Sequence, residues 1–147
     1  MRFFFVTLFF IIATNSYSIS WTKEYNGVSS SEKINLSNGR KLSHYKNSGN
    51  WTDSFGNYGT QRCFGTILTN SNKKIEDYKL FCEGIDQDRN NFVLEYYRDT
   101  NMEAGTGTYI FIDGTGQWKG SIGTICKYAI NYLDDAMFSF DKCKSNN

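Results

Sequence analysis

The stretch "CFGTILTNSNKKIEDYKLFC", residues 63–82, begins and ends with a cysteine and carries a polar cluster at its centre. Its midpoint falls between Asn72 and Lys73, inside the run "TNSNKK", which is typical of a turn. Two antiparallel strands joined there would place Cys63 directly opposite Cys82, at a separation that a disulfide can bridge. The stretch therefore predicts a β-hairpin closed by a Cys63–Cys82 disulfide.

The register of this hairpin can be checked on its neighbours, because opposite residues share a face and faces alternate along a strand. It sets Arg62 against Glu83, which is an opposite-charge pair. It also sets Phe64 against Phe81, which is an aromatic pair. Both kinds of cross-strand pair stabilise a sheet, so the register predicted from the cysteines is also favoured by the residues between them.

The stretch "CKYAINYLDDAMFSFDKC", residues 126–143, has the same design, with its midpoint between Asp134 and Asp135. It predicts a second hairpin, closed by a Cys126–Cys143 disulfide. This register sets Lys127 against Lys142, and like charges directly opposite each other are destabilising. A β-bulge could relieve that repulsion.

The chain has 4 cysteines, an even number that predicts two disulfides in an exported protein. Four cysteines allow three connectivities, of which the two hairpins favour one. A zinc site is the alternative, but no two cysteines have the C-x-x-C spacing, and an oxidising compartment favours disulfides. We expect no metal ion and no cofactor.

The N-terminal segment "MRFFFVTLFFIIATNSYS", residues 1–18, has a basic residue, Arg2, before an apolar run over Phe3–Ala13 and then small polar residues. This pattern predicts a signal peptide cleaved after Ser18. A retained, uncleaved anchor is the alternative. The run is shorter than the roughly 20 residues of a membrane span, and we expect no integral membrane segment after it. The sequence predicts a secreted or periplasmic protein.

Residues 19–147 have the length of one domain with one core. Without Arg2, the basic residues, 16 in the full chain, equal the 15 acidic ones in number. They are scattered along the chain rather than clustered, so neither a nucleic acid nor an anionic membrane is predicted as a partner.

Short β-rich runs recur along residues 19–147 at nearly regular spacing and are separated by clusters of Gly, Asn, Asp and Ser. No segment shows an apolar stripe at helical spacing. The pattern predicts an all-β antiparallel meander that closes into a small barrel of about eight strands, either filled by side chains or holding one small ligand. The predicted strands lie near Trp21–Tyr25, Lys33–Leu36, Lys41–Tyr45, Gln61–Leu68, Tyr78–Gly84, Phe92–Arg98, Gly107–Ile112, Thr124–Tyr132 and Met137–Asp141.

The glycine-rich stretch "GTGTYIFIDGTGQWKGSIGTI", residues 105–125, could be taken for a phosphate-binding loop. Its G-x-G-x-x-x-G spacing at Gly114, Gly116 and Gly120 misses the dinucleotide fingerprint by one residue, and no Walker pattern is present. The segment that follows is β-branched and aromatic, whereas a phosphate loop requires a helix there. We therefore expect the glycines to serve turns, with Asp113-Gly114 as the turn of a hairpin.

Two segments resemble a known family: "CEGIDQDRNNFVLEYYRD", residues 82–99, and "GTGTYIFIDGTGQWKGSIGTICKY", residues 105–128. Together they look like the signature of small secreted bacterial proteins with an allene oxide cyclase-like β-barrel, a likeness that covers Gln61 to Cys143. The resemblance implies the barrel fold. It carries over no catalytic position, because the pocket residues of the plant cyclases and dirigent proteins with this barrel match no motif here.

Few residues are candidates for catalysis. His44 is the single histidine, which excludes a Ser-His-Asp triad and a two-histidine metal site, and we expect it to be exposed. Glu83, Glu95 and Asp99 could bring a carboxylate into a barrel, but Glu83 is simpler as the surface partner of Arg62. The turn "DQDRNN", residues 86–91, resembles a calcium loop without the central Gly and distal Glu of an EF-hand, and a plain polar turn is favoured.

Aromatic residues are the last compositional signal. Trp21, Trp51 and Trp118 fit a well-filled core, and the last two stand beside glycine-rich turns, where they could plug a barrel end. We expect a binding module for a small apolar or aromatic molecule, or for a cell-surface partner. The alternative is a cofactor-free isomerase or cyclase that acts in an apolar cavity. A purely structural envelope protein is a third possibility.

Overall fold

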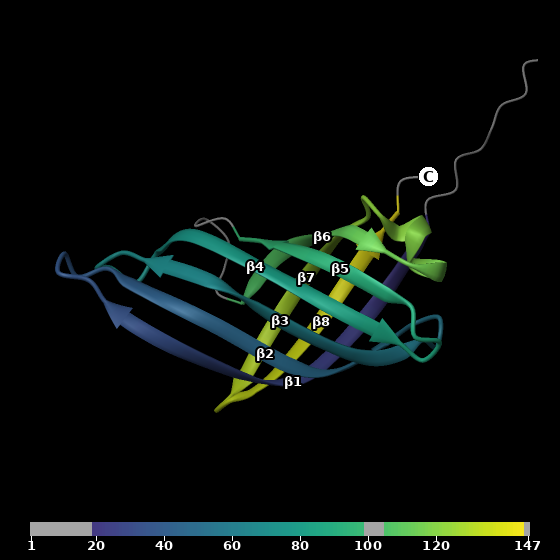
Figure 1. Ribbon diagram of the computed structural model, residues 1–147, viewed down its shortest axis with the longest axis horizontal. Helices are drawn as coiled ribbons and strands as arrows, with labels where there is room; N and C mark the ends of the chain where they lie inside the picture. The colour runs from purple at the N-terminus through teal and green to yellow at the C-terminus, as the bar shows by residue number, and fades with distance from the viewer. Residues whose placement is uncertain (1–18, 99–104, 146–147) are drawn as a thin grey trace, which may run out of the picture.

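The computed structural model describes residues 19–98 and 105–145, which form eight strands and one short 3-10 helix (Figure 1). The signal peptide predicted for residues 1–18 and the candidate carboxylate Asp99 lie outside these described residues. No helix within them is long and apolar enough to cross a membrane. The elements are β1 (Ser20–Asn35), β2 (Lys41–Asp53), β3 (Tyr58–Thr69), β4 (Ile75–Asp86), β5 (Asn91–Tyr97), β6 (Thr106–Gly114), η1 (Gly116–Ser121), β7 (Ile125–Leu133) and β8 (Ala136–Lys144).

The strands form a closed antiparallel barrel, as predicted. Each strand pairs with the next in sequence, and β8 returns to pair with β1. Closure leaves no open sheet edge. The first four strands, β1 to β4, are the longest, and the hairpins β1–β2 and β3–β4 extend to the left in Figure 1.

The first two strands are longer than predicted. The predicted run Lys41–Tyr45 continues to Asp53 in β2. The runs predicted at Trp21–Tyr25 and Lys33–Leu36 merge into the single strand β1, which ends at Asn35 and pairs continuously with β2 from Lys23 onward. The stretch between the two runs is rich in Ser and Gly and has low β propensity. Its backbone groups nevertheless bond to β2, because ladder hydrogen bonds do not depend on the side chains.

The two hairpin registers and both disulfides are confirmed. Cys63 lies opposite Cys82 in β3–β4, and Cys126 lies opposite Cys143 in β7–β8. All four cysteines are buried, so the disulfides face the barrel interior. The β7–β8 ladder has no bulge beside Lys127 and Lys142. Both lysines are exposed, so water and salt screen their repulsion.

The four turns that connect β1 to β2, β2 to β3, β3 to β4 and β4 to β5 share one geometry. In the turn between β2 and β3, the N–H of Asp53 donates to the carbonyl of Asn57, and the N–H of Gly56 donates to the carbonyl of Asp53. Gly56 has a positive φ of 86°. This is a type I turn followed by a left-handed residue. The same arrangement spans residues 36–40, 70–74 and 86–90, where Gly39, Lys73 and Arg89 hold the left-handed position.

The prediction of a hairpin turn at Asp113-Gly114 is wrong. Gly114 is still part of β6 and pairs with Phe92, and the chain then forms η1 before entering β7. The reason is tertiary: η1 turns the side chain of Trp118 into the barrel, where it is buried. Burial of a large aromatic ring outweighs the local preference of a two-residue turn.

Aromatic side chains close the barrel end that contains η1, which we call the tryptophan end. Trp118 packs edge-on against Trp51, with ring centroids 5.5 Å apart, and against Phe92 at 4.8 Å. Trp21 lies 6.3 Å from Trp118. The idea that Trp51 and Trp118 plug a barrel end is therefore correct, although Trp51 reaches the plug from strand β2 rather than from a turn.

Candidate functional site

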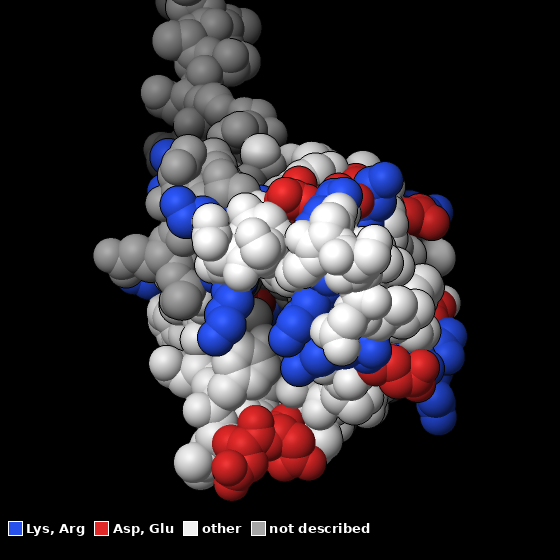
Figure 2. Space-filling model, turned by 90° about the vertical axis from the view of Figure 1, so that its left-hand side faces the viewer, with Lys and Arg blue, Asp and Glu red and all other residues white. Residues whose placement is uncertain are grey.

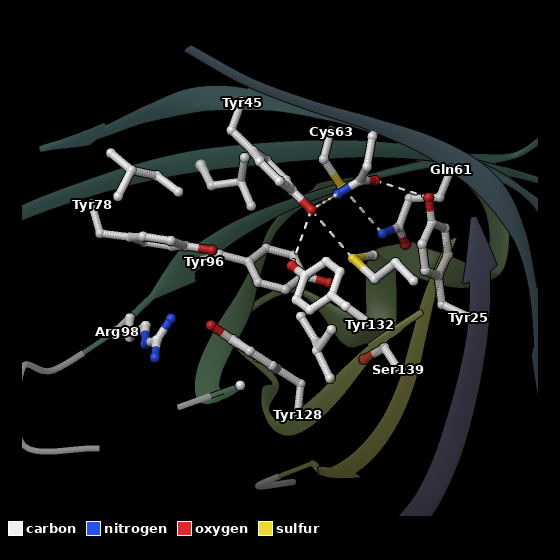
Figure 3. Close-up of a pocket in the computed structure, with 16 residues that line it drawn as sticks. Tyr25, Tyr45, Gln61, Cys63, Tyr78, Tyr96, Arg98, Tyr128, Tyr132 and Ser139 are labelled. Carbon is white, nitrogen blue, oxygen red and sulfur yellow. Dashed lines mark hydrogen bonds between the residues drawn. The ribbon is translucent and has the colours of Figure 1, made fainter. Parts of the chain in front are cut away.

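The opposite end of the barrel, which we call the tyrosine end, holds a cavity of about 90 Å³ between the interior side chains (Figure 3). Strands β1, β2, β4, β5 and β7 each place tyrosines there, because their interior positions alternate with exterior ones. Arg98, which directly follows β5, also lines it. The tyrosines that line the cavity are Tyr25, Tyr45, Tyr78, Tyr96, Tyr128 and Tyr132.

Glycine makes room for one of these rings. A Cβ atom added at Gly107 would collide with the ring of Tyr128, the residue paired with it across the β6–β7 ladder. The small residue on β6 thus lets the phenol of Tyr128 lie flat against the sheet. In Figure 3 the hydroxyl of Tyr128 is turned toward Arg98, and those of Tyr45 and Tyr78 point toward the middle of the cavity.

Hydrogen bonds connect the phenols to two amides. Tyr25 donates to Oδ1 of Asn47 at 2.8 Å, and the hydroxyls of Tyr45 and Tyr132 lie 3.2 Å apart (Figure 3). Nδ2 of Asn47 donates to the hydroxyl of Tyr45 over a long 3.5 Å. Tyr45 also contacts the sulfur of Met137 at 3.3 Å, a weak acceptor.

Burial raises the pKa of Tyr25, Tyr78 and Tyr96, because the charged form of each phenol would lose its hydration. Burial likewise raises the pKa of Tyr128 and Tyr132, and at both residues the positive charge of Arg98 acts in the opposite direction. The phenols therefore stay protonated at neutral pH. They offer O–H donors to a bound molecule and do not serve as bases.

A buried ion pair lies behind the cavity. Nζ of Lys23 is 3.4 Å from Oδ2 of Asp141 and donates to Oε1 of Gln61 at 2.9 Å. Tyr109 donates to Oδ2 of Asp141 at 3.0 Å, and the hydroxyl of Ser139 donates to Oδ1. Gln61 and Ser139 also line the cavity, so they link its wall to this pair.

The environment of Lys23 is largely apolar. Its ammonium group lies 4.9 Å from the ring centroid of Tyr109 and 5.7 Å from that of Phe92. Burial lowers the pKa of Lys23, while the charge of Asp141 and the hydrogen bond to it raise that pKa. Lys23 and Asp141 occupy the interior between the two ends of the barrel. Their charges compensate each other, and Gln61, Tyr109 and Ser139 complete their hydrogen bonds.

The residues singled out in the sequence for catalysis lie elsewhere. His44 is exposed on the outside of β2, as expected. Glu83 accepts hydrogen bonds from the guanidinium of Arg62 at 2.6 and 2.9 Å, as predicted. Glu95 is half-buried between the apolar residues of β5 and does not line the cavity. Of the four cysteines, Cys63 contributes to the cavity wall.

The "DQDRNN" turn, residues 86–91, connects β4 to β5 and is hydrogen-bonded to η1. Oδ1 of Asp86 accepts the backbone N–H groups of Asp88 and Asn90 at 2.9 and 2.8 Å. Its Oδ2 accepts Nε1 of Trp118 at 2.9 Å and Nε2 of Gln117 at 2.7 Å. Asp86 thus ties the β4–β5 turn to η1. Within residues 19–98 and 105–145, no cluster of three His, Cys, Asp or Glu side chains is placed to hold a metal ion.

Sequence reasoning missed Lys23 and Asp141, although a signal was present. Trp21, Lys23 and Tyr25 alternate in "WTKEY", which places the lysine on the same interior face as two aromatic residues. Pairing Tyr128 with Asp141 in the predicted hairpin also puts that carboxylate inside the barrel. A charged residue on each interior face indicates that the two form a pair.

The described residues that line the cavity include neither a carboxylate nor a histidine. Proton transfer at neutral pH favours a group whose pKa lies near 7, and phenols and guanidinium groups are far from that value. The arrangement is suited to holding a molecule by ring contacts and donated hydrogen bonds. A larger hollow of about 620 Å³, lined in part by Val28, His44 and Phe64, lies on the solvent-facing side of β1–β3.

No known protein family, curated protein or solved structure matches this chain. The resemblance to the allene oxide cyclase-like barrel proteins therefore stays a prediction.

Proposed function

We propose that the chain is exported and that its barrel binds a small apolar or aromatic molecule, one end of which enters the cavity at the tyrosine end. The observation that carries this proposal is the convergence of six tyrosines on one interior cavity. Tyrosine supplies a large apolar face together with a polar hydroxyl, which suits a site that receives small molecules.

The volume of the cavity limits what enters it. About 90 Å³ corresponds to roughly three water molecules, each of which takes up about 30 Å³ in the liquid. Pockets that enclose a whole drug-sized ligand have at least about 300 Å³. We therefore expect the cavity to hold a terminal group of the ligand, with the remainder contacting the rim.

Export fits the two disulfides, because buried disulfides of this kind form and persist in oxidising compartments. The secreted or periplasmic location is part of this proposal. A cofactor-free isomerase is less well supported, because no described residue in the cavity wall is suited to act as a general base at neutral pH.

A thermal-shift screen of short fatty acids, alcohols, phenols, sugars and nucleotides tests the proposal. A ligand at about 100 times its dissociation constant stabilises the barrel by roughly 2.7 kcal/mol, which raises the melting temperature by several degrees. We expect apolar or aromatic compounds to do so and sugars and nucleotides to have no effect.

A variant that fills the cavity locates the binding site. Ile130 lines the cavity and is half-buried, so Ile130→Phe should occupy the space and abolish the ligand-dependent shift. Ile112→Phe, at an exposed position on β6, is the matched control and should bind normally. An undiminished shift in Ile130→Phe, or no shift with any apolar or aromatic compound, would contradict the proposal.

A further inference from the structure

We infer that the group received by the cavity is an anion, so that the ligand is a small organic acid such as a monocarboxylate. This inference rests on the proposed binding function and names the chemical class of its ligand. Four features of the tyrosine end lead to it: the charge of the cavity wall, its hydrogen-bonding groups, its volume and the surface around it.

The wall of the cavity carries one formal charge, that of Arg98. The described residues that line it include no carboxylate, and no carboxylate within residues 19–98 and 105–145 forms an ion pair with Arg98. The nearest buried charges, Lys23 and Asp141, compensate each other at 3.4 Å. The guanidinium of Arg98 favours negative charge beside Tyr128 and Tyr132, where it lowers the pKa of the phenols, while Asp141 acts in the opposite direction at Tyr96 and Tyr128.

The side-chain oxygens of the two amides in the wall, Asn47 and Gln61, already accept hydrogen bonds from the protein. Oδ1 of Asn47 accepts the hydroxyl of Tyr25, and Oε1 of Gln61 accepts Nζ of Lys23. The N–H groups of Gln61 already have two partners, the phenol oxygen of Tyr96 and the sulfur of Cys63 at 3.4 Å. Nδ2 of Asn47 reaches Tyr45 only at 3.5 Å.

The wall thus offers donors in excess. Arg98 can donate up to five N–H groups. The O–H of Tyr45 has only the weak sulfur acceptor of Met137, and Tyr78 and Tyr128 are hydrogen-bonded to each other, so one O–H of that pair can still be donated. A ligand with hydrogen-bond acceptors would bind most favourably to these donors. A carboxylate has two acceptor oxygens and no hydrogen to donate. Neutral phenols beside a guanidinium are also a better match for an anion than for a cation, which Arg98 would repel.

The volume and the surroundings agree with this assignment. A carboxylate group has three heavy atoms, about as many as the water molecules that a cavity of about 90 Å³ would hold. Figure 2 looks onto the tyrosine end, where Lys and Arg side chains gather near the middle of the face and acidic side chains lie mostly toward its margins. An approaching anion meets a favourable field there.

Matched pairs of ligands test the inference by calorimetric titration at constant ionic strength. Benzoate is compared with benzyl alcohol, and hexanoate with hexan-1-ol, so that each pair has one tail and two head groups. We expect the acid of each pair to bind at least about tenfold more tightly than the alcohol, because charge-assisted hydrogen bonds are the stronger ones.

Variants of Arg98 identify the group responsible. Arg98→Gln should bring the affinities for acid and alcohol to within about twofold of each other, and Arg98→Lys should keep part of the preference for the acid. Arg62→Gln is the matched control, because Arg62 is an exposed arginine on the outside of β3.

The outcomes separate this inference from the proposed function. Equal affinities for acid and alcohol, or an acid preference that survives in Arg98→Gln, would overturn the anion assignment and leave the binding function standing. Binding of neither member of any pair would refute both.

Discussion

The buried ion pair of Lys23 and Asp141 is the first feature at the scale of single residues. Their side chains are 1% and 0% exposed, and each has lost its hydration. Gln61, Ser139 and Tyr109 supply hydrogen bonds in place of water. Such a pair is weak evidence for net stabilisation, but removal of one partner leaves the other charge buried and uncompensated.

We therefore predict that Asp141→Asn lowers the free energy of unfolding by roughly 3–5 kcal/mol, measured by urea denaturation. The matched control is Glu76→Gln, which breaks the Arg40–Glu76 pair, whose side chains are 37% and 36% exposed. That change should cost under about 1 kcal/mol. Equal effects of the two substitutions would show that Lys23 does not depend on Asp141.

The turns between strands are the first element-level feature. Glycine occupies the left-handed position in two of the four related turns, at Gly39 and Gly56, while Lys73 and Arg89 occupy it in the others, with φ of 62° and 65°. A residue with a Cβ atom is strained there by roughly 1–2 kcal/mol. The turns tolerate this because Asn70 and Asp86 accept backbone N–H groups within them.

Arg89→Gly should therefore raise the free energy of unfolding by about 1 kcal/mol, and Gly56→Ala should lower it by a similar amount. A Cβ atom at Gly56 meets nothing within 4 Å, so its cost is that of the backbone alone. Gly120→Ala is the control, since its Cβ atom is equally free and Gly120 has no positive φ. A loss at Gly120 as large as that at Gly56 would refute the explanation from φ.

The disulfides staple two hairpins from inside the barrel. We predict that replacing both Cys126 and Cys143 by Ala lowers the free energy of unfolding by roughly 3 kcal/mol, since the bridge closes a loop with a sequence separation of 17. The same double change at Cys63 and Cys82, with a separation of 19, should have a similar effect. Denaturation of the two double variants under non-reducing conditions measures it.

Burial adds a second expectation for the bridges. The cysteines are at most 4% exposed, so a reducing agent should reach them only when the barrel opens. Mass spectrometry after alkylation should show both disulfides intact under native conditions and lost in denaturant. Reduction in the native barrel at the rate of an exposed disulfide would contradict the interior location.

At the scale of the whole molecule, the barrel is filled by aromatic rings at the tryptophan end and lined by phenols at the tyrosine end. Burial raises the pKa of Tyr25, Tyr78, Tyr96 and Tyr109 above the ordinary value of 10.0. The folded chain therefore keeps protons that the unfolded chain releases. This contribution to stability is complete below about pH 10 and declines as the pH rises above it.

We predict that the barrel unfolds cooperatively in alkali, with most tyrosinate absorbance appearing together with the loss of β-sheet circular dichroism. Lys23 has the opposite effect, because its lowered pKa makes stability rise with pH up to 10.5, but it is one group against several tyrosines. Full ionisation of the tyrosines in a barrel that stays folded would contradict this prediction.

Export is a prediction about the whole chain. Protein recovered from outside the cytoplasm should have an intact mass that corresponds to residues 19–147 with both disulfides formed. A chain that retains Met1 in a soluble cytoplasmic fraction would refute it.

Local sequence determined the hairpins of this protein. Alternation of side chains, centred turns and the spacing of cysteines are properties of neighbouring residues, so the pairs Cys63–Cys82 and Cys126–Cys143 and the all-β class could be predicted from them. The four polar turns and the ion pair of Arg62 with Glu83 are of the same kind. Each depends on residues that are close in the chain or opposite in one hairpin.

Tertiary structure alone decided the rest. The helix η1 forms because Trp118 finds Trp51 and Phe92, which lie on other strands. The cavity exists because five strands place tyrosines at one end of the barrel. Lys23 and Asp141 meet only because β8 pairs with β1 and closes the barrel. These contacts depend on closure across nearly the whole chain. A local pattern such as "WTKEY" indicates the face on which a residue lies, but only closure decides which distant residues that face meets.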